Sequence, residues 1–298
     1  MEKPVKGVVT GSRGMLAGDL IPRMKGAGIE TVGFDLPEHD ITQPREIFLS
    51  LEAEHPDIII NCAAYTAVDR AESDHEAAFR VNRDGAGYLA DACGRLDVPL
   101  VHISTDFVFN GDSDRPYRED DRAEPLNVYG RSKWEGEEAI RARLTEHIIV
   151  RTAWLFGVHG DNFVKTILKL AREREELRVV DDQTGCPTWT GDLAGALVCM
   201  LLFLGERPGA TPWGTYHFCG AGWTTWYKFA CAIVDEARRY ERLSVRAVTP
   251  VTSDQYPVTA KRPSWSVLDT GKIAHVFGIK PLPWIEGMKA MLRELYSC

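Results

Sequence analysis

The chain has no apolar run long enough to cross a membrane. Its longest, Ala196 to Leu204, is far shorter than the roughly 20 residues that a membrane-spanning helix needs. No apolar signal segment stands before the strand-like residues Val5–Thr10, so we expect a cytoplasmic protein that does not enter a membrane. The seven cysteines are odd in number and form no C-x-x-C pair, which is typical of reduced thiols in the cytosol.

Basic clusters are missing as well. The net charge is -8, and no block of Lys and Arg resembles a nucleic-acid-binding stripe, so we expect no nucleic-acid partner. The sequence also has no internal repeat and no low-complexity linker. What remains is an ordinary globular composition, with 44% hydrophobic and 26% charged residues in a chain of 298. That length allows one large or two modest domains.

The first motif is a strand, a glycine-rich turn and a helix. Val5–Thr10 is a β-branched run, Gly11 and Gly14 follow it, and the residues up to about Gly26 are predicted to be helical. This order is typical of a βαβ unit that binds a dinucleotide. The first glycine allows a tight turn, and the second lets the backbone approach the pyrophosphate at the helix N-terminus. The spacing is looser than in most dehydrogenases, so an ordinary βα turn remains an alternative.

Asp35 ends the next predicted strand, which runs over 31–35. A carboxylate in this place binds the ribose hydroxyls of the adenosine half, although a loop Asp that caps the following segment is an alternative. Asp35 favours NADH, because it would repel a 2′-phosphate. Arg13 in the glycine-rich turn favours NADPH, because a guanidinium suits a phosphate. The sequence therefore leaves the choice between NADPH and NADH open.

Two later strands end in small or hydroxyl-bearing residues. Asp57–Asn61 and Val98–Ile103 are continuous apolar runs, which are typical of buried parallel strands. They lead into Asn61–Thr66 and Ser104–Asp106, and ligands of open α/β sheets bind outside the carboxyl ends of the strands. Four acidic residues further on are predicted to lie on the first turns of a helix, where they suit the helix dipole and do not indicate a metal site: Asp69, Glu72, Asp74 and Glu76.

Tyr129 and Lys133 stand four positions apart in a segment rich in Glu, Lys and Ala. In a helix this spacing puts them on one face. A neighbouring cation favours the phenolate and lowers the pKa of a tyrosine, so the pair predicts a proton donor and acceptor. A surface Tyr beside a surface Lys is the alternative. With the hydroxyl of Thr105 upstream, the three residues could deliver a proton to a carbonyl oxygen while a hydride reaches the carbon.

Several stretches together resemble a known family. The glycine-rich turn, Ser104–Phe109 and Tyr129–Lys133 are similar to the extended short-chain dehydrogenase/reductases. More specific stretches resemble the dTDP-4-dehydrorhamnose reductases within that superfamily: Asn61–Glu72, Arg151–Phe156, Asp161–Lys165, Asp182–Thr188 and Arg262-Pro263. The resemblance runs over essentially the whole chain, in order.

The resemblance implies a role for individual residues. Tyr129 matches the catalytic proton donor, Lys133 the residue that holds the nicotinamide ribose and lowers the pKa of the tyrosine, and Thr105 the hydroxyl that orients the substrate carbonyl. Asp106 and Trp154 match sugar contacts, while Arg262 is interpreted as a diphosphate partner or a structural salt bridge. Cofactor contacts are expected at the turn residues Gly11 and Arg13 and at Gly14, Met15, Leu16, Asp35, Asp40, Ile41, Ala64, Tyr65 and Thr66.

Some members of the family bind Mg²⁺ at a dimer interface through three Glu. The corresponding places here hold Asp19, Gly191 and a C-terminal Glu, so we carry over neither the metal nor that dimer. A monomer and a homodimer both remain open.

The expected architecture is an α/β fold with a Rossmann-type doubly wound parallel sheet and a smaller mixed α/β substrate lobe at the C-terminal end. Residues 1–153 are predicted to form the dinucleotide-binding domain and residues 154–298 mostly the substrate lobe. Strands near 177–182 and 215–219 are expected to return to the sheet. Helices are expected in the second half at 163–174, 192–204, 226–239 and 283–296.

The resemblance implies NAD(P)H-dependent reduction of the C4 ketone of dTDP-4-dehydrorhamnose (dTDP-6-deoxy-L-lyxo-4-hexulose) to dTDP-L-rhamnose. Another nucleotide-sugar reductase, an epimerase or a dehydratase is an alternative, but Asp106 is followed by Phe107 and not by the Glu of the dehydratases. A non-catalytic regulatory subunit, like the β subunit of methionine adenosyltransferase, is a further alternative. The intact Thr105, Tyr129 and Lys133 favour catalysis.

Overall fold

The computed structural model describes residues 5–207, 209, 211–256 and 258–297. Within them, six parallel strands form one sheet in the order β10-β5-β4-β3-β1-β2. These strands are β1 (Lys6–Thr10), β2 (Glu30–Phe34), β3 (Ile58–Asn61), β4 (Leu100–Thr105), β5 (His147–Thr152) and β10 (Gly214–His217). The strand order changes direction between β1 and β3, which is where doubly wound sheets bind ligands. The predicted Rossmann-type fold is confirmed.

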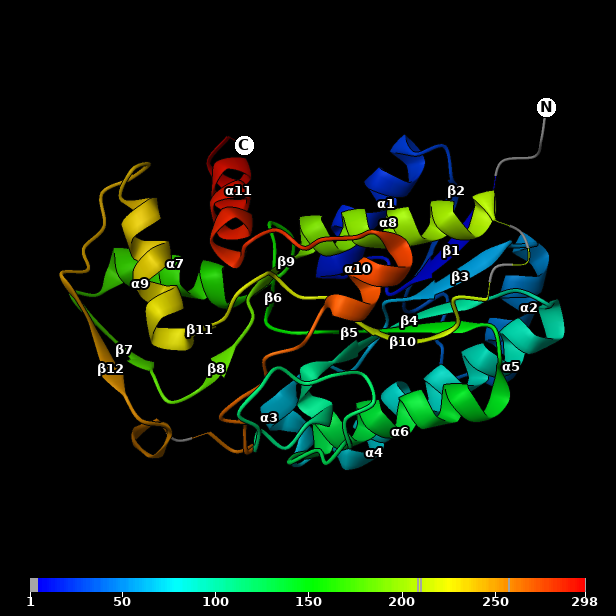
Figure 1. The fold of residues 1–298 in the computed structure, drawn as a ribbon, viewed down its shortest axis with the longest axis horizontal. Coiled ribbons are helices and arrows are strands. Elements are labelled where there is room, and N and C mark those ends of the chain that lie inside the picture. The colour runs from blue at the N-terminus through cyan, green and yellow to red at the C-terminus, as the bar shows by residue number, and fades with distance from the viewer. Residues whose placement is uncertain (1–4, 208, 210, 257, 298) are drawn as a thin grey trace.

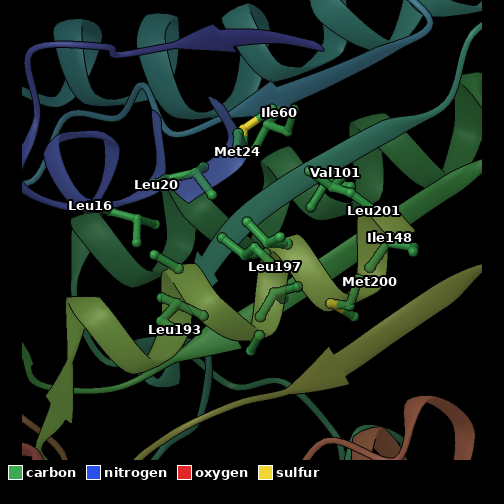
Figure 2. Packing of buried hydrophobic residues seen from close by; sticks show 14 of the residues in the cluster. Leu16, Leu20, Met24, Ile60, Val101, Ile148, Leu193, Leu197, Met200 and Leu201 are labelled. Carbon is green, nitrogen blue, oxygen red and sulfur yellow. The ribbon is translucent and has the colours of Figure 1, made fainter. Parts of the chain in front are cut away.

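Helices cover both faces of this sheet (Figure 1). On one face lie α1 (Met15–Gly26) and α8 (Thr190–Glu206), which pack against each other. Figure 2 shows how their leucines and methionines meet alternate residues of the strands. The residues labelled there are Leu16, Leu20, Met24, Ile60, Val101, Ile148, Leu193, Leu197, Met200 and Leu201. The helical members recur at intervals of three or four residues, as one buried helix face requires.

The opposite face of the sheet is covered by α2 (Pro44–Glu54), α5 (Ala86–Leu96) and α6 (Val128–Arg143). The strand residues that lie between those of the first face point here, among them Val8, Ile59, Leu100 and Ile149. The inner strands are therefore buried on both sides, which explains their continuous apolar runs in the sequence, whereas the edge strand β2 is partly exposed. Between β3 and α5 the chain forms α3 (Val68–Ala71), α4 (His75–Phe79) and a π-helical turn at Arg80–Gly85.

A second, smaller lobe is built mostly from the C-terminal half and lies on the left of Figure 1. Its helices are α7 (Phe163–Glu173), α9 (Trp226–Ala237) and α11 (Trp284–Ser297), and its two longer strands are β7 (Glu176–Val180) and β12 (Ala247–Val251). These elements share an apolar core of their own. The helices expected at 163–174, 192–204, 226–239 and 283–296 are all confirmed, with ends that differ by a few residues.

One expected strand return is wrong and the other is right. β7 pairs in parallel with β12 in a separate two-stranded sheet. It is not part of the central sheet, in which β10 pairs with β5 from Gly214 to His217. The strand expected near 215–219 is therefore the one that returns.

The remaining short elements connect the lobes. β6 (Leu155–Phe156) pairs with β9 (Thr188–Trp189), and β8 (Thr184–Gly185) pairs with β11 (Thr224–Thr225). α10 (Gly271–Phe277) and 3-10 turns at Asp106–Val108 and Ser253–Gln255 complete the described elements. In the part of the chain that is described, no helix is both long and apolar enough to span a membrane.

Candidate active site

The glycine-rich turn lies against the end of β3. Gly11 has a φ of +67°, and a Cβ atom on it would come within 2.7 Å of the Ala63 backbone, so this close approach requires glycine. Gly14 is the N-cap of α1 and supplies no side-chain cap, which leaves first-turn N–H groups available for an anion. The side chain of Leu16 is buried in the core, so only its backbone is available to a cofactor.

Arg13 and Asp35, which the sequence analysis treated separately, lie together. The Asp35 carboxylate accepts hydrogen bonds from the backbone N–H of Arg13 at 2.7 Å and of Leu36 at 2.8 Å. The Arg13 guanidinium donates to the Leu36 carbonyl at 2.6 Å and lies 3.5 Å from Glu38, with its side chain 67% exposed. A cofactor ribose at Asp35 would therefore have a guanidinium beside it.

The other expected cofactor residues line the same edge. Asp40 accepts a hydrogen bond from the Thr42 N–H at 2.9 Å, and Ile41 is buried against Gly85. Tyr65, between Ala64 and Thr66 after β3, is held on both sides of its peptide by Asn82. The phenol of Tyr65 donates to Asp74 at 3.1 Å. Asp74, which was expected only to lie on the first turn of a helix, therefore also has a side-chain partner.

Tyr129 and Thr105 come together at the carboxyl end of β4. Asn127 is the N-cap of α6, and its side chain accepts a hydrogen bond from the Gly130 N–H at 2.7 Å. This cap starts the helix one residue before Tyr129, whose phenol lies near enough to the Thr105 hydroxyl for that hydroxyl to lower its pKa. The edge of Tyr129 also packs on the ring of Phe107, with 5.7 Å between the centroids. The predicted phenol and hydroxyl thus form one pair.

Asp106 lies behind this pair. It is buried, and its Oδ1 accepts a hydrogen bond from the Thr105 hydroxyl at 3.1 Å. Its Oδ2 has no hydrogen-bond partner among the described residues. Burial raises the pKa of Asp106 to about 6, because a carboxylate is disfavoured away from water. An oxygen without a partner beside the reactive hydroxyls is well placed for a sugar hydroxyl.

Lys133 lies on the same helix as Tyr129, but its contacts differ from the expectation. Its Nζ donates to the Ile103 carbonyl at 2.7 Å and lies 3.3 Å from Nε2 of His102. Burial raises the pKa of Tyr129 to about 12, and the partner that opposes this rise is Thr105. The lowering of the tyrosine pKa by Lys133 stays a prediction, since in this structure the amine is directed toward β4. Burial also lowers the pKa of Lys133 to about 8.

The structure adds two buried residues that the sequence analysis did not place in the site. His102 contacts Lys133 directly, and Asn61 contacts His102 at 2.9 Å. His102 interrupts the apolar run Val98–Ile103. A polar residue inside a buried strand needs a hydrogen-bonding partner. The position of His102 in this apolar run could therefore have indicated a buried polar contact from the sequence alone.

Trp154 occupies a strained position in the second lobe. Its φ is +47°, which is uncommon for a residue with a side chain. Its ring stacks on Trp226 with 3.5 Å between centroids and packs against Gly185. The ring is only partly buried, so a face or edge remains for a ligand.

Arg262 is not free in this structure. Its guanidinium forms a two-point ion pair with Asp69, at 2.7 and 3.2 Å. Asp69 also accepts from the Ala260 N–H at 3.0 Å, and Glu72 accepts from the Val128 N–H at 2.8 Å. Of the two interpretations of Arg262, the structure therefore shows the salt bridge. Asp69 and Glu72, which were expected only to suit a helix dipole, also hold distant chain segments together through these hydrogen bonds.

The places that match the metal ligands of the family are occupied by internal contacts. Asp19 is buried, accepts a hydrogen bond from Thr190 at 2.5 Å and pairs with Arg23 at 3.0 Å. Gly191 lies against the ring of Trp189. Over the described residues, no three His, Cys, Asp or Glu side chains are grouped to hold a metal ion.

The sheet, the glycine turn and the hydroxyl pair define a protein of the nucleotide-binding short-chain dehydrogenase/reductase type. The family described as "RmlD substrate binding domain" matches residues 5–297. The chain therefore belongs to this family, that of the dTDP-4-dehydrorhamnose reductases.

Its relatives match over nearly their whole length. The dTDP-4-dehydrorhamnose reductase of Aggregatibacter actinomycetemcomitans is 42% identical, over 95% of this chain and 96% of that protein. The spore coat polysaccharide biosynthesis protein SpsK of Bacillus subtilis is 40% identical, over 98% of each.

Solved structures agree with this assignment. The dTDP-4-dehydrorhamnose reductase of Clostridium acetobutylicum has a TM-score of 0.90 at 36% identity, covering 98% of this chain and 99% of that one. That of Bacillus anthracis, in complex with NADP, has a TM-score of 0.90 at 35% identity, covering 98% and 100%. The UDP-glucose 4-epimerase of Brucella ovis, at 18% identity and a TM-score of 0.81 over 98% of each chain, shares the fold.

Proposed function

We propose that the chain is an NAD(P)H-dependent oxidoreductase that reduces the C4 ketone of dTDP-4-dehydrorhamnose to dTDP-L-rhamnose. Its membership of a family of reductases with this name supports the reaction. The observation that carries the proposal is that the hydroxyls of Tyr129 and Thr105 lie together at the carboxyl end of β4, with Lys133 on the same helix as Tyr129. Chemistry in open α/β sheets concentrates at this edge.

The residues present suit a dinucleotide. The close approach of Gly11 to Ala63 and the uncapped start of α1 at Gly14 fit a pyrophosphate. Asp35, Arg13, Asp40, Ile41 and the turn after β3 would hold the adenosine end and the ribose. When bound, NADPH or NADH supplies the hydride. The Bacillus anthracis relative was solved in complex with NADP, which supports a nicotinamide dinucleotide at this site.

The chain's own groups would handle the substrate. Thr105 orients the ketone oxygen, and Tyr129 gives its proton to that oxygen as negative charge develops on it. A charged Lys133 then favours the phenolate that remains. Asp106 and Trp154 would contact the sugar. Arg262 would reach the diphosphate only by giving up Asp69.

A direct assay tests the proposal. The purified protein is mixed with NADPH or NADH and dTDP-4-dehydrorhamnose, and oxidation is followed by the absorbance of the reduced nicotinamide. We expect turnover that falls by about 10² to 10⁴ in Tyr129→Phe. Sugar conversion without consumption of reduced cofactor would indicate an epimerase. No conversion at all, together with stable association with another enzyme, would favour the regulatory-subunit alternative.

Location and assembly belong to the same proposal. We infer a cytoplasmic enzyme that works as a monomer or a homodimer, with a nucleotide sugar as its small-molecule partner. The odd number of cysteines without a C-x-x-C pair supports the cytosol. Sedimentation or light scattering of the purified protein would decide between the two oligomeric states.

A further inference from the structure

Three polar side chains cross the central sheet in one row. Thr10 of β1 is in register with Asn61 of β3, and Asn61 is in register with His102 of β4. Each is only 1% exposed. The row ends at Lys133 of α6, which is equally buried. Four neighbouring polar groups in an apolar sheet are costly unless they satisfy one another.

The contacts of the row form a continuous chain of hydrogen bonds. The Thr10 hydroxyl donates to Oδ1 of Asn61 at 2.7 Å, and the same oxygen accepts from the Ala63 N–H at 3.1 Å. Nδ2 of Asn61 lies 2.9 Å from Nδ1 of His102. Nε2 of His102 then lies 3.3 Å from the amine of Lys133, which also donates to the Ile103 carbonyl at 2.7 Å.

These contacts determine where the imidazole proton lies. A backbone N–H can only donate, so the Ala63 N–H requires the oxygen of Asn61 on its side. The amide nitrogen of Asn61 therefore faces His102, and Nδ1 of His102 must accept. Burial lowers the pKa of His102 well below its usual value, so the ring is neutral. Its one N–H is consequently on Nε2, directed at Lys133.

An ammonium has three donors and no acceptor, whereas an uncharged amine has one lone pair. The Nε2–H of His102 needs that lone pair, and one N–H of the amine goes to Ile103. The charged or titratable groups facing Lys133 are Glu137 on its own helix and the thiol of Cys62 after β3. Glu137 is already paired with Arg151 and Arg141. Among the described residues near the amine, no carboxylate therefore depends on Lys133 being charged.

We propose that His102 is a positioning residue for Lys133, which holds the amine with its lone pair toward the imidazole so that this lysine exchanges its charge during use. Asn61 and Thr10 fix the tautomer that makes this possible. The link to reduction rests on the proposed function, but the tautomer and the state of the amine do not. Burial brings the pKa of Lys133 to about 8. Above that pH the amine accepts the Nε2–H, whereas below it the ammonium must turn its hydrogens away from the imidazole, because both groups would then donate.

The tautomer is measured directly on the full-length protein. Histidine labelled with ¹⁵N in the ring gives shifts that distinguish Nε2–H, Nδ1–H and imidazolium forms, and His102→Gln assigns the signal. We expect a neutral Nε2–H ring above the pKa of Lys133, where the amine is uncharged, and no imidazolium at lower pH down to about pH 5, where an ordinary histidine would be protonated. An imidazolium or an Nδ1–H ring would overturn the proposal, whatever the protein catalyses.

The pH dependence of turnover gives the second readout. In the wild type, kcat should fall on the alkaline side near the pKa of Lys133, because an uncharged amine no longer supports the phenolate of Tyr129. His102→Gln lets an amide oxygen face the amine and stabilise its charge. We expect this limb to move upward by about one pH unit, with kcat reduced by about tenfold through misplacement of the amine.

The matched control is Ser104→Ala, two residues along the same face of β4, which removes a hydrogen bond to Glu137 and leaves the Lys133 contacts. Its alkaline limb should stay in place. A slower His102→Gln enzyme with an unmoved limb would show a merely structural histidine and overturn the proposal. If the wild type does not turn over, the proposed function fails, and the labelled histidine alone decides this inference.

Discussion

Arg151 of β5 and Glu137 of α6 form an ion pair that is closed off from water. The guanidinium donates to the carboxylate at 2.7, 2.9 and 3.2 Å, and both residues are at most 1% exposed. Ser104 and Arg141 donate to the same carboxylate at 2.6 and 2.7 Å. The helix that carries Tyr129 and Lys133 is thus fastened to β4 and β5 one turn beyond the lysine.

Removing the charge of Glu137 should therefore destabilise the fold. Glu137→Gln leaves Arg151 buried without its carboxylate, and the free energy of unfolding should fall by about 3 to 5 kcal/mol. Denaturant unfolding measures this change. The control is Glu138→Gln on the next position, where the side chain is 54% exposed and the loss should stay below about 1 kcal/mol. Equal effects of the two substitutions would contradict the account.

The same carboxylate predicts a loss of stability in acid. Burial alone would raise the pKa of Glu137, but Arg151, Arg141 and Ser104 outweigh burial and lower it to about 2 from its usual 4.5. The stabilisation is therefore complete above about pH 4.5 and is lost as the pH falls toward 2. It amounts to about 3 kcal/mol. Unfolding of the wild type and Glu137→Gln at several pH values should show their difference shrinking over this window.

Asp106 should behave in the opposite sense. Because burial raises its pKa to about 6, its ionised form costs stability above that pH and costs nothing below its usual value of 3.8. Asp106→Asn should raise the free energy of unfolding at pH 8 by up to about 3 kcal/mol, and the gain should vanish toward pH 4. The exposed Asp112→Asn is the control. We also expect weaker binding of the sugar, since Asn presents an N–H in place of one oxygen.

Local patterns predicted the fold better than they predicted the contacts of the site. Continuous apolar runs identified β3 and β4, and helical spacing identified α6 with Tyr129 and Lys133 on it. The sequence pattern of a strand does not say which strand pairs with it. For this reason the pairing of β7 with β12, some seventy residues further along the chain, could not be predicted. The same holds for Lys133, because the Ile103 carbonyl that receives its amine is brought there only by the packing of α6 on β4.

The sequence could not show that Arg262 pairs with the distant Asp69, so its role as a diphosphate partner or a structural salt bridge stayed open. Two substitutions can now distinguish these roles. If Arg262 exchanges Asp69 for the diphosphate on binding, Arg262→Ala should raise KM for the nucleotide sugar by about tenfold or more, a typical loss for a charged hydrogen bond. Asp69→Asn would free the guanidinium and leave KM unchanged or lower. Steady-state kinetics and calorimetry with dTDP measure both. Equal losses in the two variants would leave Arg262 with a structural role alone.

Arg13 should decide how well the adenosine end accepts a 2′-phosphate. The Asp35 carboxylate is already taken up by the backbone N–H groups of Arg13 and Leu36, while the Arg13 guanidinium is 67% exposed and only loosely paired with Glu38. Arg13→Ala should raise KM for NADPH by about tenfold and change KM for NADH little.

Glu38→Gln is the matched counterpart, since Glu38 is the acid that the Arg13 guanidinium faces at 3.5 Å. It should lower KM for NADPH and leave KM for NADH as it is, because a neutral side chain no longer competes with the phosphate for Arg13. Equal losses for both coenzymes in Arg13→Ala would mean that the guanidinium serves through its bond to the Leu36 carbonyl, which shapes the loop for either coenzyme.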